Sequence, residues 1–145
     1  MLRLSILCVL FMFSGSLIAQ TKVTCNSIST YTWNTEGDGW KLESTLNDVS
    51  CIFLFEDETP GYDLEYNTVQ VFDYSVEGAY PNISTYGVYA IETLEDGRKL
   101  IDLDMIDSLD VFRITWNEKD QTLSFMQNGV DRLTEYKIES IEVTE

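Results

Sequence analysis

Apolar and polar residues alternate along most of the chain after residue 20. The clearest example is the segment in which Phe112, Ile114 and Trp116 alternate with Arg113 and Thr115. A period of two is typical of a β-strand with one buried face. The alternating segments are rich in the β-branched and aromatic residues that strands favour. No segment after residue 20 predicts an amphipathic helix, since even residues 100–109 contain an Asp-Leu-Asp alternation that favours a strand and a turn. The pattern therefore predicts an all-β fold.

Turn-forming residues separate the predicted strands at short intervals. The eight turn signals are Gly37-Asp38-Gly39, Asn47-Asp48, Pro60-Gly61, Gly78 to Asn82, Asp96-Gly97, Asp107-Ser108, Asn117 to Asp120 and Asn128-Gly129. They predict about eight or nine strands, and tight turns pair consecutive strands into an antiparallel meander. Closing such a sheet removes its exposed edges. We therefore predict a closed or nearly closed β-barrel, with a bent β-sandwich as the alternative.

The first 19 residues have the order of a secretory signal peptide. Arg3 precedes an apolar run over residues 4–13, and small residues follow at Ser14, Gly15, Ser16 and Ala19. The run is shorter than the roughly 20 apolar residues that span a membrane. We expect cleavage after Ala19, which leaves residues 20–145 as one secreted or periplasmic domain that is not associated with a membrane.

The chain is strongly acidic. It has 25 Asp and Glu against 9 Lys and Arg, a formal net charge of −16. Removal of residues 1–19 takes away Arg3 alone among the charged residues, so 8 cations remain and the net charge becomes −17. Such a field repels the phosphate backbone of nucleic acids, which we therefore exclude as partners.

Histidine is absent from the chain. The commonest general base and metal ligand at neutral pH is therefore missing, and no nucleophile and base can be paired from the residues that remain. Carboxylates are dense around Asp102, Asp104, Asp107 and Asp110, but their spacing does not match an EF-hand. We interpret them as a solvated strand face and turn. The sequence predicts no catalytic activity, no cofactor and no metal site. A hydrolase that uses carboxylates alone is kept as the second alternative to the function given below.

Two cysteines, Cys25 and Cys51, follow the predicted signal peptide. An even number of cysteines in an exported chain favours a disulfide. Each lies at an alternating position in a predicted strand, Cys25 on the face of Tyr31 and Trp33 and Cys51 on the face of Phe53 and Phe55. We therefore expect a disulfide between Cys25 and Cys51 on the interior side, with two buried free thiols as the alternative.

Aromatic residues are frequent, and Trp33 and Trp40 flank one glycine-containing turn. Tyr and Trp combine apolar area with a hydrogen-bonding tip, which suits the mouth of a ligand-binding barrel. The candidate ligand-binding residues are Tyr31, Trp33 and Trp40. We expect a small exported acidic β-domain without catalytic activity that binds a small ligand or an envelope or extracellular protein. The first alternative is a purely structural or accessory secreted domain.

Overall fold

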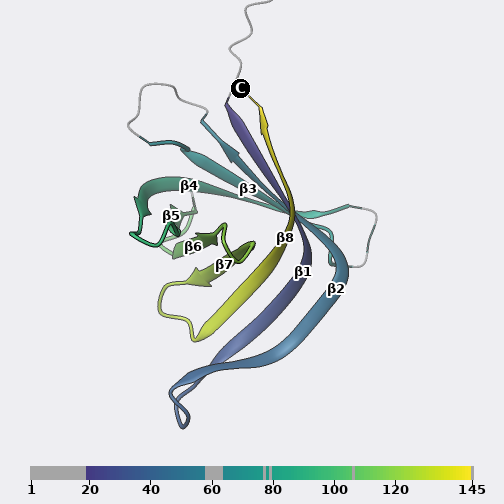
Figure 1. Cartoon of the computed structure of the whole chain (residues 1–145), viewed down its shortest axis with the longest axis vertical. Coiled ribbons are helices and arrows are strands. Elements are labelled where there is room, and N and C mark those ends of the chain that lie inside the picture. Colours follow the sequence, from purple (N-terminus) through teal and green to yellow (C-terminus); the bar gives the residue numbers. More distant parts are fainter. Residues whose placement is uncertain (1–18, 58–63, 77, 79, 106, 145) are drawn as a thin grey trace, which may run out of the picture.

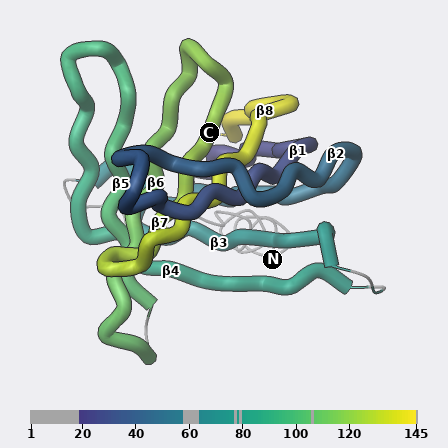
Figure 2. Tube along the Cα trace, turned by 90° about the horizontal axis from the view of Figure 1, so that it is seen from below, coloured from purple at the N-terminus to yellow at the C-terminus, as the bar shows by residue number. Residues whose placement is uncertain are grey.

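The computed structural model describes residues 19–57, 64–76, 78, 80–105 and 107–144. These residues form eight antiparallel strands in consecutive order, and β1 pairs with both β2 and β8 to close a barrel. The strands are β1 (Gln20–Asn34), β2 (Gly39–Glu56), β3 (Thr68–Asp73), β4 (Asn82–Thr93), β5 (Lys99–Asp104), β6 (Val111–Asn117), β7 (Thr122–Gln127) and β8 (Arg132–Thr144). Figure 2 traces the strands around the barrel. The predicted meander and closed barrel are confirmed, and the sandwich is excluded.

The turn signals explain most of the connections. Asp96-Gly97 and Asn128-Gly129 lie in the β4–β5 and β7–β8 turns, where Gly97 and Gly129 adopt φ of 90° and 78°. Positive φ is the conformation in which glycine carries no steric cost, and it is common in tight hairpins. The Pro60-Gly61 signal and residues 1–18 of the predicted signal peptide lie outside the described residues.

One predicted turn is a β-bulge. The Asn47-Asp48 signal falls inside β2, which continues from Gly39 to Glu56. Asp48 has a φ of 56°, and the β1–β2 register shifts between the pairs Cys25–Cys51 and Ser27–Asn47. Aspartate tolerates the left-handed conformation in bulges as it does in turns, so residue type alone does not separate the two. The described residues therefore form eight strands, the lower end of the predicted range.

The β1–β2 hairpin is much longer than the rest of the sheet. β1 and β2 have 15 and 18 residues, whereas β3, β5 and β7 have six each. The part of the hairpin that comprises residues 27–47, here called the arm, extends beyond the other hairpins (Figure 1). β3 pairs with β2 only over residues 51–56, so the arm leaves one edge of β2 without a strand partner among the described residues.

The barrel interior is apolar. Ten side chains that are almost fully buried come from β1, β2, β3, β5, β6 and β7, namely Val23, Cys25, Cys51, Phe53, Phe55, Val69, Ile101, Leu103, Ile114 and Leu123. Alternate residues on these strands point inward, as the period of two predicts. Within the described ranges no helix is long and apolar enough to cross a membrane.

Candidate functional site

The barrel is filled at the end where β2–β3, β4–β5 and β6–β7 connect. Phe55 stacks on Trp116 with ring centroids 5.2 Å apart and contacts Tyr66 at 5.3 Å. Tyr66 comes from the β2–β3 connection, and its hydroxyl lies 3.2 Å from Oγ1 of the buried Thr21. Side chains therefore close this end of the barrel.

The opposite end contains a cavity of about 230 Å³. This end, where the β3–β4 and β7–β8 hairpins turn, is here called the mouth. The residues that line the mouth cavity are Phe53, Val71, Asp73, Asn82, Ser84, Tyr86, Phe125 and Tyr136. The volume is somewhat below the roughly 300–1,000 Å³ of drug-sized ligand sites, and an engineered apolar cavity of about 150 Å³ is known to admit benzene. The cavity therefore has room for one ring and a short substituent.

Strand register places one wall of the mouth cavity. Val71 on β3 is the partner of Phe53 on β2 and of Ser84 on β4, and Asp73 is the partner of Asn82. Register partners in antiparallel strands point to the same face. The inward face of β3 and β4 therefore changes from apolar to polar as it approaches the mouth.

Aromatic rings form the floor and the facing wall of the mouth cavity. Phe53 and Tyr136 are 4.9 Å apart, centroid to centroid, with their planes at 77°. Tyr86 and Phe125 are 5.5 Å apart at 61°. Edge-to-face pairs of this kind are worth about 0.5–1.5 kcal/mol beyond the area they bury. The rings support one another, and ring surfaces remain available to the cavity.

Asp73 is the one charged residue in the lining. Its Oδ1 accepts a hydrogen bond of 2.8 Å from the Ser75 backbone amide. The ion pairs found in the described part of the chain are Lys22–Glu142, Arg98–Asp96, Lys99–Glu65 and Arg113–Asp102, and none of them involves Asp73. The mouth cavity therefore carries a carboxylate that no protein cation balances within that part.

The two tyrosine hydroxyls of the mouth cavity are neutral at physiological pH. Burial raises the pKa of Tyr136 well above its ordinary value, and Cys51 and Asp73 nearby raise it further. Burial also raises the pKa of Tyr86, although a hydrogen bond with Ser84 opposes the shift. Both phenols thus keep their protons and can donate or accept a hydrogen bond.

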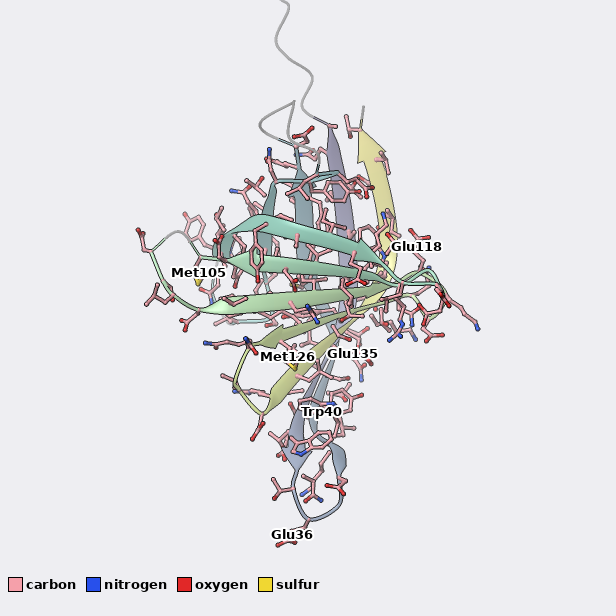
Figure 3. All side chains as sticks on the ribbon, turned by 90° about the vertical axis from the view of Figure 1, so that its left-hand side faces the viewer. Glu36, Trp40, Met105, Glu118, Met126 and Glu135 are labelled. Carbon is pink, nitrogen blue, oxygen red and sulfur yellow. The ribbon has the colours of Figure 1, made fainter. Side chains whose placement is uncertain are left out.

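The predicted aromatic residues lie outside the mouth cavity. Trp33 and Trp40, which flank the β1–β2 turn, are register partners near the tip of the arm, and their ring centroids are 5.3 Å apart with the planes at 79°. Their exposed fractions are 39% and 40%. Figure 3 shows Trp40 on the arm between its tip at Glu36 and Met126 of the barrel.

A β-bulge explains why Tyr31 and Trp33 do not share the face of Cys25. Asn26 has no partner on β2 or β8, and the register shifts there on both sides. An extra residue reverses the alternation, so buried Ile28 follows buried Cys25 at an odd spacing. The prediction that Cys25, Tyr31 and Trp33 share one face is wrong.

On the outer face of the arm, apolar residues of neighbouring strands lie side by side and form a row that reaches β7 of the barrel. Tyr31 pairs with Leu42 on β2 and with Leu133 on β8, and Leu133 pairs with Met126 on β7. An open groove of about 280 Å³ lies beside this row, lined by Trp33, Trp40, Met126, Gln127, Gly129, Val130 and Asp131. Tyr31 does not line the groove. Of the three predicted residues, the structure therefore brings two, the tryptophans, into one groove.

The structure places the two cysteines in contact range but does not join them. Cys25 and Cys51 are register partners on β1 and β2, both are buried, and both are free thiols. The structure contains no disulfide between them, and the predicted interior position is confirmed. Burial raises the pKa of Cys25 to about 12 and that of Cys51 still further. The thiols are therefore protonated at neutral pH and are poor nucleophiles while the barrel is folded.

The acidic residues of β5 lie on the solvent side, as predicted. Ile101 and Leu103 are fully buried, whereas Asp102 and Asp104 occupy the alternate positions. Arg113 Nε donates to Asp102 Oδ1 at 2.7 Å, and Arg113 Nη2 donates to Oδ2 at 3.1 Å. Across the residues that the structure covers, no three Asp, Glu or Cys side chains gather as a metal site would require.

The mouth cavity was not predicted, although the sequence contains a signal for it. Asp73 follows Val69 and Val71 at even spacing, and Asn82 and Ser84 precede Tyr86 in the same way. Polar residues at inward positions near the end of a strand indicate that the core stops there.

Comparisons with known proteins do not assign the chain to a family. A scan against protein-family models finds no match, and neither a search of curated proteins nor a search of solved structures does. The fold and the site define an eight-stranded antiparallel barrel that is filled at one end and has a small, partly polar cavity at the other.

Proposed function

We propose that this chain is an exported binding protein that takes one small, largely apolar molecule into the mouth of the barrel and has no catalytic activity. The observation that carries the proposal is the difference between the two ends. Phe55, Tyr66 and Trp116 fill one end, whereas the other has a cavity of about 230 Å³ with aromatic rings opposite three polar side chains. Small-molecule sites typically combine apolar walls with a few polar groups that fix orientation.

Two observations bear on the alternatives. A hydrolase that uses carboxylates alone needs two carboxyl groups about 5–9.5 Å apart. The mouth cavity provides Asp73 as its one carboxylate, so this cavity lacks such a pair. A purely structural domain would be expected to fill its barrel at both ends, because empty space beside a core forfeits packing contacts. Binding of a small molecule therefore fits this cavity better than either alternative.

The cavity is tested by filling it. Val71→Phe adds a ring to the lining on β3, and we expect it to weaken the binding of a small neutral aromatic such as 2-phenylethanol at least tenfold. Val76→Phe is the matched control, because Val76 is half exposed in the β3–β4 connection. Titration followed by NMR should give saturable shifts at Phe53, Tyr86 and Tyr136 in the natural protein and in the control. Shifts that do not saturate, or that Val71→Phe leaves unchanged, would contradict the proposal.

Export and the cysteine bond are part of the same proposal. Register partners in an antiparallel pair have Cα atoms about 4.5–5.5 Å apart, within the range that a disulfide spans. In an oxidising compartment, Cys25 and Cys51 would give up two protons and two electrons to an external disulfide oxidant, which becomes a dithiol.

One intact-mass measurement on protein recovered from outside the cytoplasm tests both points. We expect a chain that begins at Gln20 and is about 2 Da lighter than the dithiol form, with no alkylation of the unfolded chain until a reductant is added. A chain that keeps Met1 would contradict export, and two alkylated thiols without reductant would contradict the disulfide.

A further inference from the structure

The lining of the mouth cavity bears on the charge of an occupant as well as on its size. Its lining has one carboxylate, two neutral phenols, an amide and a hydroxyl, and no lysine or arginine. The chain as a whole carries a formal net charge of −16. An anionic ligand would therefore meet an unbalanced carboxylate inside a repulsive field, and it is the least suitable occupant.

A cation fits both walls of the mouth cavity. Asp73 offers carboxylate oxygen for a charge-assisted hydrogen bond, which is stronger than a bond between neutral groups. The aromatic rings of Phe53, Tyr86, Phe125 and Tyr136 lie in the same lining, and ring faces attract a cation. A purely apolar ligand would offer Asp73 no cation and no further hydrogen-bond donor beyond the Ser75 amide when it displaced water from the cavity.

We propose, building on the small-molecule function above, that the natural ligand is a small organic amine. Its ammonium group binds Asp73, with Asn82 and Ser84 beside it, and its apolar body packs against Phe53, Phe125 and Tyr136. A cavity of about 230 Å³ holds about eight groups of roughly 30 Å³ each, the volume that one water molecule takes up in the liquid. The apolar part of the amine therefore has about the size of one ring with a two-carbon chain.

Three probes with the same ring and different charge test the inference. The probes are 2-phenylethylamine, 2-phenylethanol and phenylacetate, titrated at pH 7 and constant ionic strength. We expect the amine to bind at least tenfold more tightly than the alcohol, and the acid to bind more weakly than both. The alcohol reports on the cavity alone, so its failure to bind would count against the proposed function itself. Binding of the alcohol and the amine with equal affinity would overturn only the amine inference.

A pair of variants assigns the selectivity to one carboxylate. Asp73→Asn keeps the shape of the side chain and removes its charge, and we expect it to weaken amine binding at least tenfold while alcohol binding changes less than threefold. Glu118→Gln is the control, since it removes the same charge from an exposed residue in the β6–β7 turn, at the opposite end of the barrel (Figure 3). If Glu118→Gln weakened amine binding as much as Asp73→Asn did, net charge rather than Asp73 would select the ligand, and the assignment would be wrong. Unchanged amine binding in Asp73→Asn would contradict it too.

Discussion

Phe55→Ala is expected to lower the free energy of unfolding by about 3–5 kcal/mol, a large fraction of the stability of a domain of this size. Phe55 is fully buried on β2 and packs against Trp116 and Tyr66 at the closed end of the barrel. Truncation removes the ring and leaves a cavity that the surrounding strands can fill only in part, because each is held by hydrogen bonds to two neighbours. Urea denaturation measures the loss as a lower midpoint with an unchanged slope.

An exposed aromatic residue provides the control for Phe55→Ala. Tyr80 lies in the β3–β4 connection with 86% of its surface exposed. Tyr80→Ala should change the free energy of unfolding by no more than about 0.5 kcal/mol, as is usual for surface positions. Equal losses in the two variants would show that the closed end is not packed as described.

The connections could be predicted from the sequence because turn chemistry is local. Asn128-Gly129 and Asp96-Gly97 each join two strands, since glycine accepts positive φ where the chain reverses. Once the turns are short, consecutive strands must pair antiparallel, and a sheet of eight such strands closes. The burial of Ile101 and Leu103 beside outward Asp102 also follows from alternation alone.

The bulges could not be predicted, and they decided which residues face inward. A bulge changes the alternation by one residue without any marker in composition. The extra residue Asn26 turned Tyr31 and Trp33 to the outer face, and β2 continues through Asp48, which has a positive φ, where a turn was expected. The long arm follows from that continuity.

The candidate site depends on pairs that are distant in the sequence. Phe53 and Tyr136 come together because β1 lies between β2 and β8, and Asp73 reaches the same cavity because β3 pairs with β2. Periodicity can assign each of these residues to a face of its strand. Periodicity does not predict how far along the barrel axis the apolar core extends, because that depends on the stagger of all eight strands. Trp33 and Trp40 are conspicuous in the sequence because they flank one turn, but they lie on the arm and do not line the mouth cavity.

The disulfide proposed between Cys25 and Cys51 should stabilise the protein by about 3.5 kcal/mol relative to the dithiol form, in the chain-entropy model. The bond would close the loop that contains the whole arm, so the unfolded chain loses the freedom of that long segment. For a domain of this size the difference corresponds to a rise in melting temperature of roughly 10–15 °C. Because both thiols are buried, the dithiol form must be prepared by reduction of the unfolded chain and then refolded.

The Cys25→Ala, Cys51→Ala double variant separates the bond from the packing of the sulfur atoms. It should be less stable than the disulfide form, and its unfolding should not respond to reductant. The natural chain should lose stability when it is reduced, down to a value near that of the double variant. Equal stability of the natural chain with and without reductant, together with two thiols that react in the unfolded chain, would mean that the pair stays as free thiols. In that case the register of β1 and β2 alone holds the two cysteines beside each other, with Asp73 next to Cys51 at the cavity.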